Sequence, residues 1–146
     1  MKNDFRLDAS LAYRIHRLQR LLRRHFLQAA TARGFTLTPE QFFVLTKLTQ
    51  RDGQSQSELA DAALHDRPNL TRMLGDLEER GLIARRPDPS DARRRLVHLT
   101  AAGARLHAGF VAQVVLPARG DLFDGLDPDD LAAAHAVFDA LERRLG

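Results

Sequence analysis

A run of three arginines, Arg93 to Arg95, contains the residues of this chain whose type and spacing point most clearly to chemistry. The run follows a polar turn, Asp88-Pro89-Ser90-Asp91, and precedes the short alternating segment Leu96-Val97-His98-Leu99. Neighbouring guanidinium groups repel one another unless an anion lies against them. The run therefore predicts an anionic partner.

Positive charge is concentrated around this run. The formal net charge of the chain is +3, but residues 80–95 contain six arginines and only two acids, so the other residues sum to −1. The six are Arg80, Arg85, Arg86, Arg93, Arg94 and Arg95. A basic patch on an otherwise near-neutral chain indicates a defined footprint on a phosphate backbone.

The segment 67–80, just before the patch, has the pattern of an amphipathic helix. Its apolar residues Leu70, Met73, Leu74 and Leu77 recur at helical spacing and must face the core. The opposite face carries Asn69, Arg72 and Asp76, with Arg67 and Thr71 on its flank near the N-terminus. In a helix lying in the major groove of DNA, asparagine pairs with adenine and arginine with guanine. The alternative is a solvated helix with an Arg72–Asp76 ion pair.

The basic residues that follow this helix predict a two-stranded hairpin. Ile83 to Arg86 forms one strand, residues 87–93 a polar loop, and Arg95 to Leu99 the returning strand. Such a wing reaches the groove next to the one that the helix occupies, and arginine is favoured in a narrow minor groove. The alternative is an exposed hairpin that has no ligand or that binds an acidic protein surface.

The arginines of the wing and Asp91 each have a predicted role in DNA binding. We expect Arg93 to enter the groove, with its guanidinium held in place by Asp91. Phosphate contacts are predicted for Arg85, Arg86, Arg94 and Arg95 of the wing, and for Ser55 and Gln56 at the start of an earlier helix.

Start and stop signals divide the chain into helices around the wing. Asp8 is expected to cap a first helix that ends at Arg33-Gly34, and Thr38 to Gln41 form a capping box for a second helix that ends near Asp52-Gly53. A capping box at Ser55 to Glu58 begins a short helix to Ala63, and the helix 67–80 has a cap at Asp66 and a stop at Gly81. Thr100 caps a helix to Val115, which Pro117 bends or ends. Asp127 begins a last helix to Leu145.

A short helix, a tight turn, a second helix and a hairpin follow one another in the order of a winged helix-turn-helix. The predicted fold class is mainly α with a small β-hairpin wing. We assign residues 36–103 to a DNA-binding domain, and residues 1–35 and 104–146 to a helical dimerisation region.

Residues 58–103 resemble the MarR family of bacterial transcriptional regulators. The resemblance lies in ELA, the segment TRML..LEERGLI.R, DPSDAR and L..LT..G at their mutual distances. Pro68-Asn69 departs from the small hydroxyl residues common at that point, and Ala62-Ala63-Leu64-His65 lacks a glycine in the turn. The resemblance implies a homodimer with interlocked terminal helices on a pseudo-palindromic DNA site. It also implies an aromatic or anionic effector that binds between these helices and the winged domain and weakens DNA binding.

The terminal segments independently predict a dimer. Their apolar faces are too long for one small winged domain to cover, and a two-fold dimer places two recognition helices about 34 Å apart, one turn of DNA. The faces comprise Leu11, Ile15, Leu18 and Leu22 in the first helix and Leu131, Ala134, Val137, Phe138 and Leu141 in the last. Arginines on the first helix either meet an anionic effector or form a solvated face: Arg14, Arg17, Arg20, Arg23 and Arg24.

Several other functions lack their sequence signals. With no cysteine, the chain has no disulfide framework, thiolate catalysis or thiol-based sensing. The six histidines include no i,i+4 metal pair, and neither a glycine-rich phosphate loop nor a catalytic triad is visible. No apolar run approaches the roughly 20 residues of a membrane span. We expect a cytoplasmic protein without enzymatic activity or cofactor.

The favoured hypothesis is therefore a ligand-responsive regulator, in the main a repressor, that binds duplex DNA as a homodimer. Two alternatives remain open at this point. One is a winged-helix module that binds a protein and not DNA, and the other is a regulator that responds to a metal such as zinc assembled from distant residues.

Overall fold

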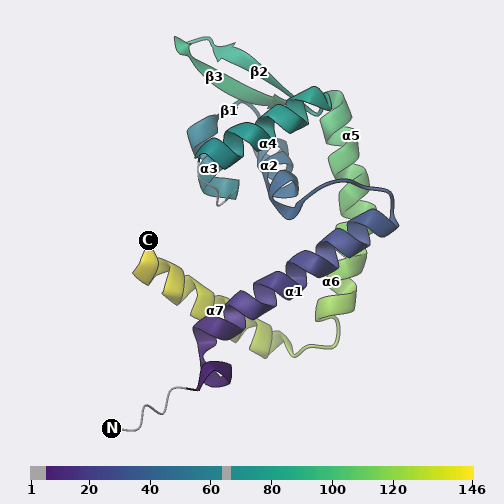
Figure 1. The fold of residues 1–146 in the computed structure, drawn as a ribbon, viewed down its shortest axis with the longest axis vertical. Coiled ribbons are helices and arrows are strands. Elements are labelled where there is room, and N and C mark those ends of the chain that lie inside the picture. Colours follow the sequence, from purple (N-terminus) through teal and green to yellow (C-terminus); the bar gives the residue numbers. More distant parts are fainter. Residues whose placement is uncertain (1–5, 64–66) are drawn as a thin grey trace.

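The computed structural model describes residues 6–63 and 67–146. At one end of the molecule lie α2, α3, α4 and the hairpin of β2 and β3, and at the other lie α1, α6 and α7 (Figure 1). The elements are η1 (Leu7–Ala9), α1 (Leu11–Ala32), α2 (Pro39–Gln50), β1 (Gln54–Ser55), α3 (Gln56–Ala63), α4 (Arg67–Glu79), β2 (Ile83–Asp88), β3 (Asp91–Leu99), α5 (Ala101–Phe110), η2 (Val111–Val115), α6 (Leu116–Phe123) and α7 (Pro128–Leu145). This order confirms the predicted winged helix-turn-helix with flanking helices.

Most of the predicted helix boundaries are confirmed, because they depend on local hydrogen bonds. The Gln41 N–H donates to Thr38 Oγ1 (3.2 Å) while the Thr38 N–H donates to Gln41 Oε1 (3.1 Å), which completes the capping box of α2. Gly81 adopts a left-handed conformation (φ 72°) directly after α4. The predicted cap at Asp8 is wrong: Asp8 lies in η1, and the Ser10 side chain caps α1 instead. The predicted cap at Asp66 lies outside the described residues.

The hairpin is longer than predicted. Most of the predicted loop 87–93 is strand, and only two residues, Pro89 and Ser90, separate β2 from β3. The Asp88 carboxylate accepts hydrogen bonds from the Ser90 N–H (2.9 Å) and hydroxyl (2.7 Å), and this Asx turn reverses the chain early. The regular pairing runs from Ile83 opposite Leu99 to Pro87 opposite Arg95, and after a register shift between Pro87 and Asp88 it closes with Asp88 opposite Asp91.

A third strand, β1, completes the sheet in the order β1-β3-β2. Its two residues pair with β3, Gln54 opposite Val97 and Ser55 opposite Leu96. This strand leads directly into α3, so the hairpin is connected through β1 to the start of that helix.

The helix that follows the sheet continues past Pro117, where a bend or an end was predicted. Residues Val111–Val115 form a π-helical turn, in which the Leu116 N–H donates to the Val111 carbonyl, and α6 then begins with Pro117 in its first turn. Proline is tolerated there because the first turn of a helix requires no N–H from it. The resulting helical rod joins the winged end of the molecule to the other helices (Figure 1).

The core lies between α2, α4 and the sheet. Leu70, Leu74 and Leu77 of α4 are fully buried, which confirms the predicted inner face of this helix, and Met73 is half-buried beside them. Phe110 joins this core to α1 and α2, with its ring centroid 5.2 Å from that of Phe26 and 5.3 Å from that of Phe42. The inner face of α4 is thus fixed, and its outer face is presented to solvent.

Candidate nucleic-acid interface

The outer face of α4 presents Asn69 and Arg72 as one exposed ridge. The Arg72 Nη2 donates a hydrogen bond of 2.6 Å to Asn69 Oδ1 one turn earlier. This contact holds the guanidinium over the N-terminal half of the helix, the part that contacts base edges when a helix lies in the major groove.

The two flanking residues, Arg67 and Thr71, connect α4 to α3. The Arg67 Nη2 donates to Ser57 Oγ (3.1 Å), and the Thr71 hydroxyl donates to the Arg67 carbonyl (2.9 Å) and accepts a hydrogen bond from the Gln56 side chain. All four side chains of this connection lie on the surface, three of them exposed and that of Gln56 partly so. They hold the N-terminal ends of the two helices together.

The ion pair considered for Arg72 and Asp76 is not formed. Asp76 instead accepts a hydrogen bond from Gln41 Nε2 (2.7 Å) and lies 3.7 Å from the Arg80 guanidinium. Its carboxylate is thereby turned toward α2, so Arg72 keeps its contact with Asn69.

The wing arginines differ in how they are held. Arg86, Arg93 and Arg95 are exposed, whereas the Arg85 guanidinium lies on the Glu78 carboxylate of α4, with Nη2 3.0 Å from Oε1 and Nε 3.3 Å from Oε2. Glu78 also accepts the Arg85 backbone N–H (3.1 Å), and these contacts lower the pKa of its carboxyl. Arg85 was expected on phosphate, and the structure assigns it a contact within the protein because β2 lies against α4.

Asp91 also departs from its predicted contact. Its carboxylate accepts a hydrogen bond from the Arg93 backbone N–H (3.0 Å), rather than one from the guanidinium. Asp91 therefore shapes the backbone at the start of β3, and the Arg93 side chain remains exposed.

Ser55 is not available for the predicted phosphate contact. It is buried, and it forms a capping box with Glu58: the Glu58 N–H donates to Ser55 Oγ (3.2 Å) and the Ser55 N–H donates to the Glu58 carboxylate (2.7 Å). The carboxylate occupies the start of α3 and would repel a phosphate. Gln56, assigned the same role, donates its side-chain amide to Thr71.

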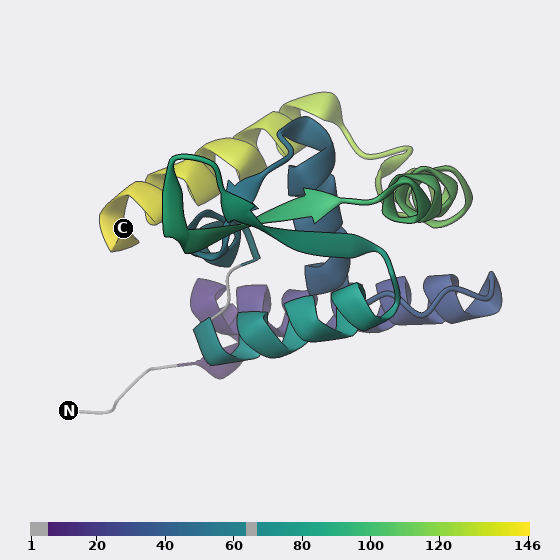
Figure 2. The same ribbon diagram turned by 90° about the horizontal axis from the view of Figure 1, so that it is seen from above.

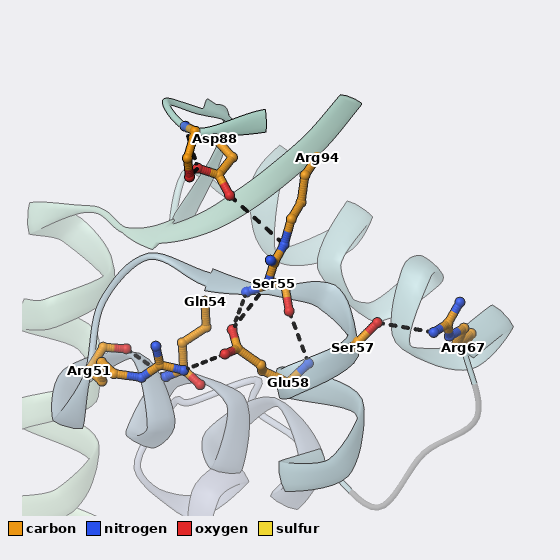
Figure 3. A network of polar contacts seen from close by, with 9 residues as sticks. Arg51, Gln54, Ser55, Ser57, Glu58, Arg67, Asp88 and Arg94 are labelled. Carbon is orange, nitrogen blue, oxygen red and sulfur yellow. Dashed lines mark hydrogen bonds and ion pairs between the residues drawn. The ribbon is translucent and has the colours of Figure 1, made fainter. Parts of the chain in front are cut away.

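Glu58 stands at the centre of a polar network that sequence reasoning missed (Figure 3). Its carboxylate lies 2.9 Å from Arg51 Nη2 and 4.0 Å from Arg94 Nη2. The hydrogen bond from the Ser55 N–H and the contact with Arg51 lower its pKa to about 2. Arg51, Glu58 and Arg94 come from three separate parts of the chain, so the capping box was the only sign of this network in the sequence.

The hairpin and α4 lie side by side at the same end of the molecule (Figures 1 and 2). The exposed ridge of α4 and the exposed wing arginines therefore belong to the same end of the molecule, and α7 and the N-terminal half of α1 lie toward the other end. This arrangement is what contact with two neighbouring grooves of one duplex requires.

The opposite end carries exposed apolar side chains. Leu11, Leu18 and Leu22 of α1 and Val137 and Phe138 of α7 are each between 38 and 53 % exposed. An open groove of about 390 Å³ runs between α1 and Phe138, and a second of about 660 Å³ lies along the second half of α1 beside Arg20, Arg23 and Arg24. Of these arginines, Arg23 is paired with Glu40 of α2.

Two of the histidines have ordinary structural contacts. His98 Nδ1 lies 3.0 Å from Asp52, and His107 Nε2 lies 2.9 Å from the Thr46 hydroxyl. Within residues 6–63 and 67–146, no group of three histidine or acidic side chains is arranged to hold a metal ion. In the same residues, no helix combines the length and the apolar character that crossing a bilayer demands.

Comparison with known proteins places this geometry among transcriptional regulators. The model of the MarR family matches residues 37–94. The transcriptional regulator HosA of Escherichia coli O111:H- is 36 % identical over 100 residues, which cover 66 % of this chain and 70 % of HosA. The structure superposes on the transcriptional repressor CouR bound to a 23-mer DNA duplex with a TM-score of 0.84, at 32 % identity over 93 % of this chain and 94 % of that one. CouR from Rhodococcus jostii RHA1 bound to p-coumaroyl-CoA gives a TM-score of 0.80 at 25 % identity, with the same coverage of both chains.

Proposed function

This chain belongs to the MarR family of transcriptional regulators, and from that premise we propose that it is a ligand-responsive repressor that binds a pseudo-palindromic duplex as a homodimer. The observation that carries the proposal is the placement of the Asn69–Arg72 ridge and the exposed wing arginines at one end of the fold. CouR, which is similar over nearly the whole chain, has been seen on a DNA duplex.

In the proposed complex, α4 lies in the major groove. Arg72 and Asn69 contact base edges, and Arg67 and Thr71 lie beside them at the N-terminus of the helix. Arg93 enters the neighbouring groove, while Arg86 and Arg95 neutralise phosphates. Arg85 is left out of this set because its guanidinium lies on Glu78, and Ser55 because it is buried in the capping box of α3. Gln56, which is partly exposed beside Thr71, keeps its proposed phosphate contact.

The same proposal assigns residues 36–103 to DNA binding, and residues 1–35 and 104–146 to dimerisation. Exposed apolar residues of α1 and α7 support this division, because a second copy would remove them from water. The repeated half-site of a pseudo-palindrome then matches the two-fold symmetry of the protein.

The proposed effector is a small aromatic or anionic molecule that binds between the winged domain and the terminal helices. The open groove along the second half of α1, which residues of α1 alone line, supplies the positive charge of Arg20 and Arg24. CouR from Rhodococcus jostii RHA1 has been seen bound to p-coumaroyl-CoA, a ligand that is both aromatic and anionic, which supports the same chemical class here.

The test is to select duplexes from a random library with the purified protein and to measure affinity by fluorescence anisotropy at several salt concentrations. We expect an inverted repeat to emerge, and the logarithm of affinity to fall by about 0.9 per phosphate contact for each decade of salt. Retention of no duplex, or an affinity that salt does not change, would refute the proposal and favour a protein partner.

A further inference from the structure

We propose that Glu58 of α3, through its contact with Arg94 of β3, fixes the position of the wing relative to the recognition helix α4, so that Arg94 positions the wing and does not contact phosphate. The inference rests on the proposed DNA-binding function. It assigns a role in sequence-specific binding to an acidic residue at the protein's basic end.

The first step concerns what a glutamate at position 58 adds. A capping box is completed by glutamine as well as by glutamate, and the chain itself demonstrates this in α2, where Gln41 closes the box with Thr38. The charge of Glu58 is therefore not required for capping. Near a surface that meets phosphates, a negative charge opposes DNA binding. The charge of Glu58 must therefore form another favourable interaction within the protein.

That contribution is visible in the partners of the carboxylate (Figure 3). Arg51 follows α2 and lies 2.9 Å from Oε1, while Arg94 of the hairpin lies 4.0 Å from Oε2. Arg94 is also 4.0 Å from the Asp88 carboxylate, whose side chain is only 10 % exposed. Arg94 thus lies between two carboxylates, one on α3 and one at the turn of the wing.

The second step concerns how β3 is supported. Its pairing with β1 ends at Leu96, opposite Ser55, so the outer half of β3 has only β2 as a neighbouring strand. Arg94 lies two residues beyond the last pair and meets the residue that caps α3. The backbone of β1 connects the inner half of β3 to α3, and the contact between the Arg94 and Glu58 side chains connects the outer half of β3 to the same helix.

The third step separates Arg94 from the arginines on either side of it. Side chains alternate along a strand, so Arg93 and Arg95 point to one face of the hairpin and Arg94 to the other. The face of Arg95 is the one near α4, because Arg95 shares it with Val97 and with Arg85, which pairs opposite Val97 and contacts Glu78 of α4. Arg94 therefore faces away from its two neighbours and toward Glu58.

The wing is then held from both sides by the helix-turn-helix. Glu78 of α4 holds Arg85 of β2, and Glu58 of α3 holds Arg94 of β3. With both contacts in place, the hairpin keeps one orientation relative to α4, which a site spanning two grooves requires.

The experiment uses Glu58→Gln, which preserves the capping box and removes the charge. Its control is Glu79→Gln, the same substitution at an exposed residue of α4. Affinity is measured for the duplex selected by the parent protein and for a duplex of unrelated sequence. Thermal unfolding by circular dichroism verifies that each variant is folded.

We expect Glu58→Gln to lower affinity for the selected duplex by about fivefold or more, because each wing of the dimer loses an ion pair of the strength found at partly exposed sites. Affinity for the unrelated duplex should stay the same or rise, since a negative charge has been removed. Glu79→Gln should leave the ratio of the two affinities unchanged. If Glu58→Gln raises both affinities in parallel with the control, the inference is overturned.

A second pair of variants tests the role of Arg94 by the salt dependence of binding. Removal of an arginine that neutralises a phosphate lowers the slope of log affinity against log salt by about 0.9 for each phosphate concerned. We expect this decrease for Arg95→Gln but not for Arg94→Gln, which should lower the affinity ratio as Glu58→Gln does. An equal decrease in slope for both arginines would overturn the inference alone. A parent protein that selects no duplex would overturn the proposed function, and this inference with it.

Discussion

The Arg85 guanidinium of the wing lies on the Glu78 carboxylate of the recognition helix, with two nitrogen atoms 3.0 and 3.3 Å from its two oxygens. This pair joins β2 to α4 across a connection of a few residues that contains Gly81. It means that α4 and the wing, the two elements proposed to bind DNA, are not independent, and that a count of wing arginines overstates the number available for phosphates.

The pair yields a prediction that distinguishes Arg85 from its neighbour Arg86. We expect Arg85→Ala to lower the free energy of unfolding by about 0.5–1 kcal/mol, the upper range for a partly exposed ion pair, and to leave the salt dependence of DNA binding unchanged. Arg86→Ala should do the opposite: little change in stability, and a salt slope smaller by about 0.9 for each phosphate that Arg86 neutralises in the parent complex. Urea denaturation and anisotropy titrations measure the two quantities. Equal behaviour of the two variants would contradict this division of roles.

A second prediction concerns the ridge of α4. Arg72→Ala should weaken binding to the selected duplex by about 1–3 kcal/mol and relax the preference at one base pair of each half-site. Because Asn69 accepts a hydrogen bond from Arg72, the double variant Asn69→Ala/Arg72→Ala should cost less than the sum of the single variants. Titrations against duplexes changed at single positions measure both effects. Strict additivity would show that the two side chains act separately.

Local signals made much of this fold predictable from the sequence. The capping boxes at Thr38 and Ser55 involve residues three apart, so their hydrogen bonds follow from the residue types alone. The buried face of α4 likewise follows from the spacing of Leu70, Leu74 and Leu77.

The incorrect predictions concern features that depend on strand register or on contacts between residues distant in sequence. Two residues of β1 are too few to show an alternating pattern, and the Asx turn at Asp88 shortened the loop that polarity alone suggested. The partner of Arg85 depends on how β2 lies against α4, which no local pattern encodes. Arginines on opposite faces of a strand look equivalent in a sequence until that register is known.

Substitution of two glycines, Gly103 and Gly75, by alanine is expected to change the stability of the protein in opposite directions. A Cβ added at Gly103 would lie 2.0 Å from the Leu82 carbonyl oxygen, at the point where α5 begins against the turn before β2, while one at Gly75 within α4 meets nothing within 4 Å. We therefore expect Gly103→Ala to destabilise the protein by about 3 kcal/mol or more through overpacking against backbone. Gly75→Ala should stabilise it by up to about 1 kcal/mol, because alanine favours a helix interior. Thermal denaturation gives both values, and the same sign for both variants would contradict the packing around α5.

His107 makes stability depend on pH. Its ring stacks on Phe42 at an interplanar angle of 8°, and burial lowers its pKa from 6.5. The Thr46 hydroxyl donates to the Phe42 carbonyl (2.8 Å), so it accepts from His107 Nε2 (2.9 Å), and we infer the neutral tautomer with its proton on Nε2.

The sign of the effect follows from this lowered pKa. In acid the unfolded chain binds a proton at His107 more readily than the folded chain does, so the stabilisation is fully present above the unfolded pKa near 6.5 and is lost as pH falls through the folded pKa. We expect the difference in unfolding free energy between the parent and His107→Gln to shrink as pH is lowered from about 7.5 to about 5, a range that spans the ordinary histidine pKa. His16→Gln, at an exposed position of α1, is the control for the substitution itself. Urea denaturation at a series of pH values measures the difference, and a gap between parent and His107→Gln that widens in acid would mean that His107 is charged in the folded protein.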